Sequence, residues 1–403
     1  MILTTRHAFM SSQASAPGMQ TARTSAATTK LVVSAEPAFD FAGADYRSLQ
    51  QNSRATAFQN GRWLSALHHD VASAAGAEPV TVVVRDAADG RLVLVLPLAR
   101  HRAQGVLFLT FADFGLCDYL GPIYDPLDVP LLLADASLPR GVAAALPRHD
   151  VLQLTKLVAG DALLERLFPK AYRARMRVSA YPVKIRSGWE AWRMEALATG
   201  FRRDLDTKRR RIARRGAPEF VRLDDPEEIV RAFDALRRFR AERFAERGAR
   251  DVLDNDAVFS FYRRIAVDGA KDGTARTFCL YLSGEPAAVM FGIVDRRTFS
   301  LILVGFDLAR YRRLSIGLLA IEDTLRASFE AGDSVYDFTI GDYPYKAQFG
   351  GEVRPLYEWY QARTWRGRAA VFAIALMREA KRALKPLLKR RKSKPAKNGA
   401  AAA

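Results

Sequence analysis

The sequence predicts a mixed α/β (α+β) fold in which mostly antiparallel sheet is flanked by helices. Three observations support this prediction. Two β-rich segments within residues 80–98 are joined by a turn at 88–90, which is typical of a hairpin. Three strand-like segments within residues 276–304 indicate an antiparallel meander. A helical pattern then begins near Ser315, ends at Gly332 and is followed at once by another strand-like segment.

The composition indicates a globular protein with an anionic partner. The chain has 403 residues, which accommodates one to three domains, and a formal net charge of +18 from 62 Lys and Arg against 44 Asp and Glu. Such an excess fits a phosphorylated cofactor, a nucleic acid or an acidic membrane surface. Cys117 and Cys279 lie far apart in apolar segments, so we interpret both as reduced core residues of a cytoplasmic protein and expect no metal site. No segment approaches the roughly 18 apolar residues of a membrane span.

The first part of the chain alternates between helix and strand patterns. Residues 1–30 are rich in Ser, Thr, Ala and Gln without any acidic residue, so we predict a disordered leader. Order is expected from Leu31, with a helix over 58–75 and a further strand over 106–111. A turn at 118–122 carries polar side chains.

A strongly basic helix is expected over residues 201–216, which read FRRDLDTKRRRIARRG. Leu205 and Ile212 are its apolar anchors. Two interpretations remain open: a solvated basic helix, or a positive wall beside an anionic ligand or acceptor. Dedicated nucleic-acid recognition is not expected, because the interleaved aromatic residues of a single-strand platform are missing.

The elements after this helix are predicted from caps and periodicity. Asp225 and Pro226 have the residue types of a helix N-cap and first turn, and the helix is expected to end at Gly248. The remaining predicted elements are a helix over 255–267, strands over 276–282, 287–294 and 298–304, a helix over 315–332, and strands over 335–340 and 356–364.

The segment from Gly305 to Gly351 has the features of an anion site. Arg310, Arg312 and Arg313 lie in a loop between a strand and a helix whose predicted N-cap is Ser315. Exposed amides and the helix dipole favour a pyrophosphate at such a position.

The C-terminal segment is basic and amphipathic. A helix is expected from residue 367 at least up to Pro386, which should kink or end it, and residues 393–403 should be disordered. Phe372 and Met377 are among its apolar residues. Two interpretations remain open: the helix packs against an apolar edge, or it lies on an acidic membrane surface.

The second half of the chain resembles a GNAT-type acetyltransferase domain, and more narrowly the CelD family of cellulose- and exopolysaccharide-associated acetyltransferases, relatives of the FemABX transferases. The matching segments are the basic run 202–216, the turn and strands around Tyr281–Ala288, the helix start Ser315–Gly317, and Asp337–Asp342 leading to Tyr345 and Lys346. Ile316 stands where relatives often have proline. The resemblance implies tandem GNAT-like domains, which we expect at 31–184 and 185–365, followed by the tail 366–403.

This resemblance implies acyl transfer from acetyl-coenzyme A, or another acyl-coenzyme A, to an amine or hydroxyl in polysaccharide or cell-envelope biosynthesis. The acceptor would be a sugar, a lipid-linked intermediate or an amine. The implied cofactor-binding residues are Arg310, Arg312, Arg313, Leu314, Ser315, Ile316 and Gly317. The implied catalytic residues are Asp337 or Asp342 as the base and Tyr345 as the acid, with Lys346 and Gly341 at the substrate.

Two other functions stay open at this point. One is a FemABX-like transferase that uses aminoacyl-tRNA, which the net charge and the basic run favour. The other is a non-catalytic basic scaffold that docks at a membrane polysaccharide synthase through its tail. An acyl-coenzyme A enzyme requires a cleft between the strands at 298–304 and 335–340, whereas a scaffold requires none.

Overall fold

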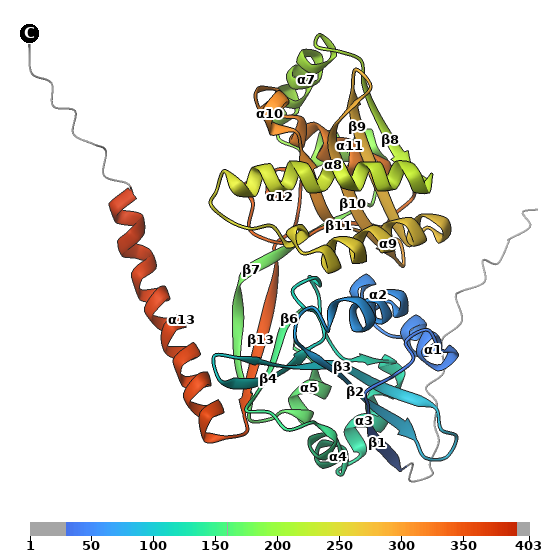
Figure 1. The fold of residues 1–403 in the computed structure, drawn as a ribbon, viewed down its shortest axis with the longest axis vertical. Helices are drawn as coiled ribbons and strands as arrows, with labels where there is room; N and C mark the ends of the chain where they lie inside the picture. Colours follow the sequence, from blue (N-terminus) through green and yellow to red (C-terminus); the bar gives the residue numbers. More distant parts are fainter. Residues whose placement is uncertain (1–29, 159, 393–403) are drawn as a thin grey trace, which may run out of the picture.

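The computed structural model describes residues 30–158 and 160–392, without the side chains of residues 381–392. The segments that we predicted as a disordered leader and a disordered end lie outside the described residues, apart from residue 30. Figure 1 shows two lobes connected by two long strands, with the C-terminal helix along one side. We call residues 30–171 the N-terminal lobe and residues 185–353 the C-terminal lobe.

One sheet of thirteen strands runs through both lobes, in the order β1-β2-β3-β4-β6-β13-β7-β12-β11-β10-β9-β8, with β5 paired to β3. The strands are β1 (Leu31–Glu36), β2 (Glu78–Asp86), β3 (Leu92–Ala103), β4 (Val106–Phe111), β5 (Ile123–Tyr124), β6 (Val151–Leu157), β7 (Tyr172–Lys184), β8 (Pro218–Leu223), β9 (Ala275–Leu282), β10 (Glu285–Asp295), β11 (Thr298–Phe306), β12 (Val335–Ile340) and β13 (Arg354–Ala362). Most neighbouring strands are antiparallel, which confirms the predicted mixed and mostly antiparallel architecture.

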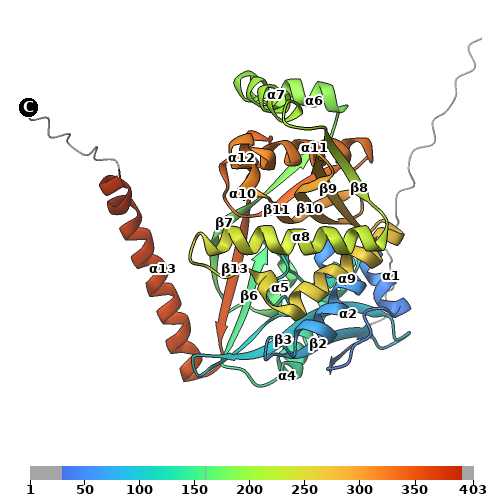
Figure 2. The same ribbon diagram turned by 45° about the horizontal axis from the view of Figure 1, so that its top comes forward.

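Helices cover both faces of this sheet. They are α1 (Ala44–Asn52), α2 (Gly61–Ala66), α3 (Val129–Ala134), α4 (Leu138–Ala145), α5 (Ala162–Leu167), α6 (Trp189–Ala196), α7 (Thr199–Ala213), α8 (Pro226–Ala245), α9 (Asp256–Asp272), α10 (Leu308–Tyr311), α11 (Ile316–Glu330), α12 (Pro344–Gln348) and α13 (Trp365–Lys392), with short turns η1 (Ala57–Gln59), η2 (Leu67–Val71), η3 (Pro126–Asp128), η4 (Val252–Asp254) and η5 (Arg312–Leu314). In the C-terminal lobe, α8 and α9 lie on one face, and α6, α7 and α11 on the other (Figure 2).

The locally encoded elements form as predicted. The hairpin is β2–β3 and the meander is β9–β10–β11. Asp225 caps α8 because its side chain accepts a hydrogen bond from the amide of Glu228 at 2.9 Å. The single helix predicted over 58–75 is instead three consecutive pieces, η1, α2 and η2.

The two lobes exchange strands. β7 follows β6 in sequence but pairs with β12, whereas β13 follows β12 and lies between β6 and β7. The domain boundary at residue 184 stays a prediction. Residues 354–362, at the end of the predicted second domain, pair with β6 of the N-terminal lobe and with β7.

The C-terminal helix α13 begins close to the sheet. A Cβ atom at Gly367 would lie 2.0 Å from the carbonyl oxygen of Asp150, so only glycine permits this approach. The helix does not end at Pro386, where we expected a kink or stop, but continues to Lys392. Within the described part of the chain, no helix is long and apolar enough to cross a bilayer.

Candidate active site

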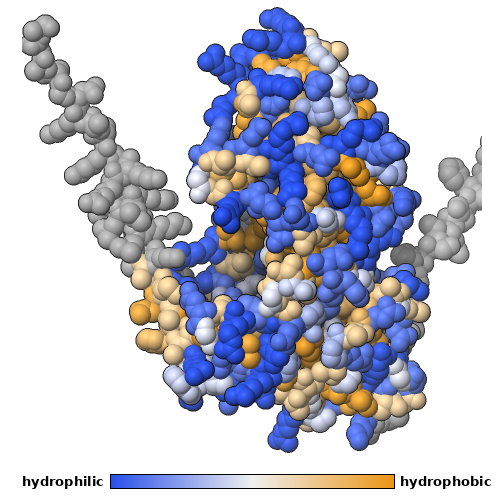
Figure 3. Space-filling model, viewed as in Figure 1, coloured by the Kyte–Doolittle hydropathy of each residue, from blue (hydrophilic) through white to orange (hydrophobic). Residues whose placement is uncertain are grey.

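Two parallel strands of the C-terminal lobe separate at the centre of the sheet. The pairing of β11 with β12 covers three residue pairs and ends at Ser300 opposite Asp337. β11 continues to Phe306 and β12 to Ile340 without further pairing to each other. The predicted sites all lie near this separation. Figure 3 shows a hollow between the two lobes, on the side of the molecule that faces the viewer in Figure 1.

A bend in β12 accompanies this separation. Thr339 has φ +57°, a left-handed conformation that costs free energy for a β-branched residue. The side chain of Asp337 accepts a hydrogen bond from the Thr339 amide at 2.8 Å, and the Thr339 hydroxyl donates to the carbonyl of Leu301 at 3.1 Å. The bend is therefore held by side chains on both sides of the separated strands.

Lys346 also holds the bent strand end. Its ammonium is buried and donates to the carbonyls of Phe338, Thr339 and Ile340 at 2.8, 3.2 and 2.9 Å. Burial lowers the pKa of Lys346 to about 8. Because an ammonium has three protons and all three have partners, the predicted substrate-binding residue supports the backbone in this structure.

Gly341, the other predicted substrate-binding residue, is required by this geometry. Its φ is +119°, and a Cβ atom would lie 3.0 Å from the ring of Tyr343 and 3.6 Å from Lys346 Nζ. Glycine therefore lets the chain turn tightly around the ammonium.

Asp337 joins the two lobes. Its carboxylate is 3% exposed and accepts a hydrogen bond from the Tyr119 hydroxyl of the N-terminal lobe at 2.7 Å. Burial raises the pKa of Asp337, and the hydrogen bonds from Tyr119 and the Thr339 amide partly offset that rise. With both oxygens bonded inside the protein, this residue has the position of a structural support.

Asp342 and Tyr345 lie closer to solvent. Asp342 is exposed and accepts hydrogen bonds from the Ser179 amide and the Tyr181 hydroxyl, both at 3.0 Å. Tyr345 is half-buried, and burial together with the neighbouring Tyr343 raises its pKa to about 12. Its hydroxyl therefore stays protonated at neutral pH, and it has no hydrogen-bond partner among the described residues.

Asp118 of the N-terminal lobe was not among the predicted site residues. Its side chain is half-buried, and burial raises its pKa. A hydrogen bond from Thr339 and the positive charges of Lys156 and Lys346 act in the opposite direction. Asp118 therefore faces the bend in β12 from the other lobe. The sequence signal was the polar turn at 118–122, but nothing in the sequence relates it to β12.

The predicted anion site lies at the start of α11. Ser315 occupies the N-cap position but has φ +53° and makes no side-chain cap, so our prediction of a capping side chain is wrong. Leu314 and Ile316 are buried, so their side chains are not exposed to a ligand. A Cβ atom at Gly317 would lie 3.1 Å from the ring of Phe306, so glycine lets this helix start at the end of β11.

The three predicted arginines are not equivalent. Arg310 lies 3.5 Å from Asp307 and 4.0 Å from Glu285, and Arg312 pairs with Glu246. Arg313 is exposed and has no ion pair with any described residue. Arg313 is therefore the member of this set whose charge is free for an anion.

The basic helix α7 is partly neutralised by α11. Arg209 pairs with Glu322 and Asp323 at 2.7 and 2.8 Å, and Glu322 is buried. Leu205 and Ile212 lie in the core as predicted. Several other arginines of this segment are exposed without an acidic partner among the described residues: Arg203, Arg210, Arg211, Arg214 and Arg215.

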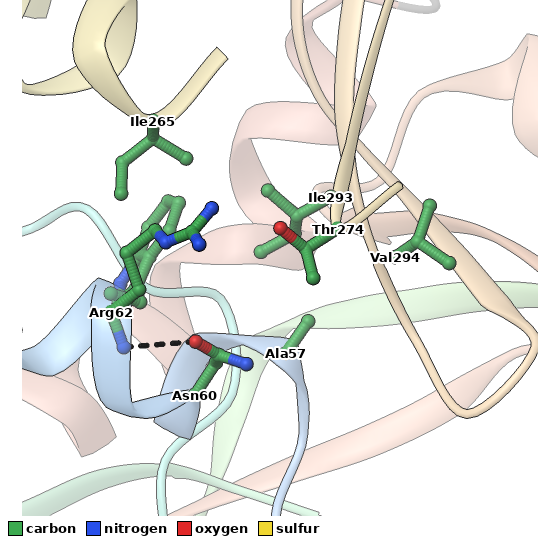
Figure 4. A pocket seen from close by; sticks show the side chains of 8 residues that line it. Ala57, Asn60, Arg62, Ile265, Thr274, Ile293 and Val294 are labelled. Carbon is green, nitrogen blue, oxygen red and sulfur yellow. Dashed lines mark hydrogen bonds between the residues drawn. The ribbon is translucent and has the colours of Figure 1, made fainter. Parts of the chain in front are cut away.

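A separate shallow pocket lies between the lobes (Figure 4). Asn60, Arg62 and Trp63 line it from one side, and Ile265 and Ile293 from the other. The Arg62 guanidinium pairs with Asp272 at 2.5 Å. None of the predicted site residues lines this pocket. The described residues also contain no group of three or more His, Cys, Asp or Glu side chains placed to hold a metal ion.

Comparison with known proteins finds one family match within the C-terminal lobe. Residues 199–347 match the family model described as an acetyltransferase (GNAT) domain. The matched range includes every predicted site residue from Arg310 to Lys346.

One solved structure shows a similar fold. The structure of FemX is 11% identical with a TM-score of 0.53, and the alignment covers 81% of this chain and 96% of FemX. This similarity shows the fold alone. L-PGS from Bacillus licheniformis is 13% identical with a TM-score of 0.49, covering 84% of this chain and 96% of that chain.

A tandem GNAT protein from the clavulanic acid biosynthesis pathway is 14% identical with a TM-score of 0.46. The alignment covers 83% of this chain and 98% of that protein. A search of curated proteins finds no significant match. The narrower resemblance to the CelD family stays a prediction.

Proposed function

We propose that the C-terminal lobe transfers an acyl group from an acyl-coenzyme A to an amine or hydroxyl acceptor. The observation that carries this proposal is the separation of β11 from β12, within the range that matches the GNAT domain. Separated parallel strands lose the ladder hydrogen bonds between them, and a helix start adds amides that favour anions.

The donor would be held at the start of α11. The proposed donors are the amides of Leu314–Gly317 and the guanidinium of Arg313, which has no ion pair with a described residue, together with Arg310 and Arg312 in the turns just before α11. These donors suit the pyrophosphate of coenzyme A. When bound, the thioester would supply an activated acyl carbonyl.

The proton chemistry is assigned to two side chains from different lobes. Asp118 is the proposed proton acceptor, because it lies near Thr339 at the bend in β12 and burial raises its pKa. Tyr345 is the proposed proton donor, because its hydroxyl is protonated and unpartnered. Asp342 is the alternative acceptor. Asp337 and Lys346 position the strand end that these groups surround.

The acceptor class rests on the family resemblance. We assign the reaction to polysaccharide or cell-envelope biosynthesis, with a sugar, a lipid-linked intermediate or an amine as the acceptor. A pH profile separates the two candidate bases: Asp118→Asn should remove the acidic limb of kcat/KM, whereas Asp342→Asn should preserve it.

Calorimetric titration with acetyl-coenzyme A tests the donor assignment. We expect micromolar binding to the wild-type protein and about tenfold weaker binding to Arg313→Ala, because a charge-assisted contact to phosphate is lost. Arg140→Ala is the matched control, since Arg140 is an exposed arginine in the first turn of α4. Absence of binding at millimolar ligand would overturn the proposal.

A second function is favoured by the exposed arginines of the α7 segment. Their positive charge suits a nucleic-acid backbone, and the FemABX resemblance implies aminoacyl-tRNA as the donor. Binding of tRNA should then weaken steeply with salt, and the slope of log K against log salt should fall by about two in Arg211→Ala/Arg214→Ala. An unchanged slope would reject this alternative.

A further inference from the structure

The helix α13 presents large apolar side chains to solvent. Trp365 is 70% exposed, Phe372 71%, Leu376 59% and Met377 55%. Trp365, Phe372 and Leu376 are spaced seven and four residues apart, so they lie on one side of the helix, which we call the outward face. Figure 3 shows apolar side chains on the described part of this helix. A contiguous row of this size is unusual on a surface without a partner.

The opposite face of α13 packs against the sheet. Gly367 is buried, Val371 and Ile374 are half-buried, and the helix packs against β13, β4 and β6. Arg378 pairs with Glu358 of β13 and donates to the carbonyl of Arg175 at 2.6 Å. The helix is therefore fixed to the sheet through this side, and the outward face cannot turn inward without breaking these contacts.

The charge of the segment is strongly one-sided. Residues 365–392 contain one acidic residue, Glu379. The basic residues of the same range are Arg366, Arg368, Arg378, Lys381, Arg382, Lys385, Lys389, Arg390, Arg391 and Lys392. At helical spacing, Arg366 and Arg368 flank the outward face on its two sides. Apolar side chains between basic flanks are typical of helices that lie in the plane of a lipid interface.

We propose that the outward face of α13 docks on a membrane surface that contains anionic lipid. Trp365, Phe372 and Leu376 would enter the boundary between headgroups and acyl chains, and Arg366 and Arg368 would contact the lipid phosphates. A second copy of the chain is the poorer occupant, because it would bring two strongly basic helices together. This proposal stands independently of acyl transfer.

Sedimentation of the full-length protein with lipid vesicles tests the proposal. We expect the partition coefficient to be about tenfold higher for vesicles of phosphatidylglycerol and phosphatidylcholine than for phosphatidylcholine alone, and to fall with salt. Phe372→Gln/Leu376→Gln should reduce it about tenfold, because glutamine keeps the helix but removes the apolar area. Met194→Gln is the matched control, since Met194 is 64% exposed on α6, and should change little.

Two results would overturn the proposal. One is equal sedimentation of the wild-type protein and Phe372→Gln/Leu376→Gln. The other is absence of vesicle binding together with a dimer, measured by light scattering, that dissociates in the double variant; that would assign the outward face to a second copy. Circular dichroism of each variant confirms that a loss of binding is not a loss of folding.

Discussion

The two lobes contain the same strand arrangement with different outcomes. In the N-terminal lobe, β4 and β6 pair in parallel over three residue pairs, from Phe108 opposite Val151 to Thr110 opposite Gln153. In the C-terminal lobe, β11 and β12 also pair over three residue pairs. Each pair is preceded by an antiparallel meander and flanked by an exchanged strand. The two lobes therefore share one strand topology, and they differ in which side chains occupy the space next to the parallel strands.

Both parallel pairs are followed by a bend. Lys156 of β6 has φ +60°, and Thr339 of β12 has φ +57°. In the N-terminal lobe the space beyond the bend is filled by the protein itself: Leu120 donates its amide to the Lys156 carbonyl at 3.2 Å, and Lys156 Nζ pairs with Asp113 at 2.6 Å. In the C-terminal lobe, Lys346 supports the bend from one side.

The connections explain this difference. Between β11 and β12 the chain forms α11, fifteen residues long, whose start lies beside an unpaired arginine. Between β4 and β6 it forms the loop before β5 and the short helices α3 and α4. That loop carries Asp118 and Tyr119 to β12. The N-terminal lobe therefore contributes the side chains of Asp118 and Tyr119 to the bend in β12 of the C-terminal lobe.

The largest expected effect comes from removing the lysine that lies at either bend, Lys346 or Lys156. Lys346→Met leaves three buried carbonyls unpaired, and we expect the free energy of unfolding to fall by about 3 kcal/mol. Lys156→Met leaves the Asp113 carboxylate unpaired and should cost about 2 kcal/mol. Urea titrations measure both. A cost for Lys346→Met below that of Lys156→Met would contradict the role of Lys346 as backbone support.

The contact between the lobes should have an intermediate effect. Tyr119→Phe removes the hydroxyl that donates to the buried Asp337, which should lower the free energy of unfolding by about 2 kcal/mol. Tyr124→Phe, whose hydroxyl donates to Asp161 at 2.9 Å within the N-terminal lobe, is the control and should cost about 1 kcal/mol. If Tyr119→Phe and Tyr124→Phe lower the free energy of unfolding equally, the hydrogen bond between the lobes stabilises the protein no more than one within a lobe.

The last expected effect is a pH dependence. The pKa of Lys346 is lowered from 10.5 to about 8 in the folded protein, so the unfolded chain binds more protons between these values. The stability contribution of Lys346 therefore rises from pH 8 toward pH 10. Thermal unfolding of the wild-type protein should show this rise relative to Lys346→Met. If the contribution of Lys346 to stability falls between pH 8 and pH 10, burial of the ammonium is not the main cause of its lowered pKa.

Much of the fold could be predicted because its signals are local. Turn residues and alternation identified β2–β3 and the meander, and Asp225 with Pro226 identified the start of α8. The strand exchange could not be predicted, since β13 has the same alternation whether it pairs with β12 or with β6. Pairing between distant strands depends on contacts that no short pattern encodes.

The sequence indicated which segment holds the candidate site, but not which of its side chains are buried. The segment from Arg310 to Lys346 was found because a basic loop, a helix start and a polar strand end follow one another. Burial was not visible in the sequence: Asp337 and Lys346 are buried, and Ser315 makes no side-chain cap. Asp118 was missed because 219 residues of sequence separate it from Asp337.

The exchanged strand β13 has a consequence for how the protein is made. The ribosome completes β6 about two hundred residues before β13, which becomes its neighbour in the sheet. Until then the edge of β6 has no partner on that side, and an unpaired edge is prone to aggregate. A fragment ending at residue 184 would keep that exposed edge permanently. Production of soluble N-terminal fragment should therefore require the missing strand, supplied in trans as a peptide spanning residues 354–362.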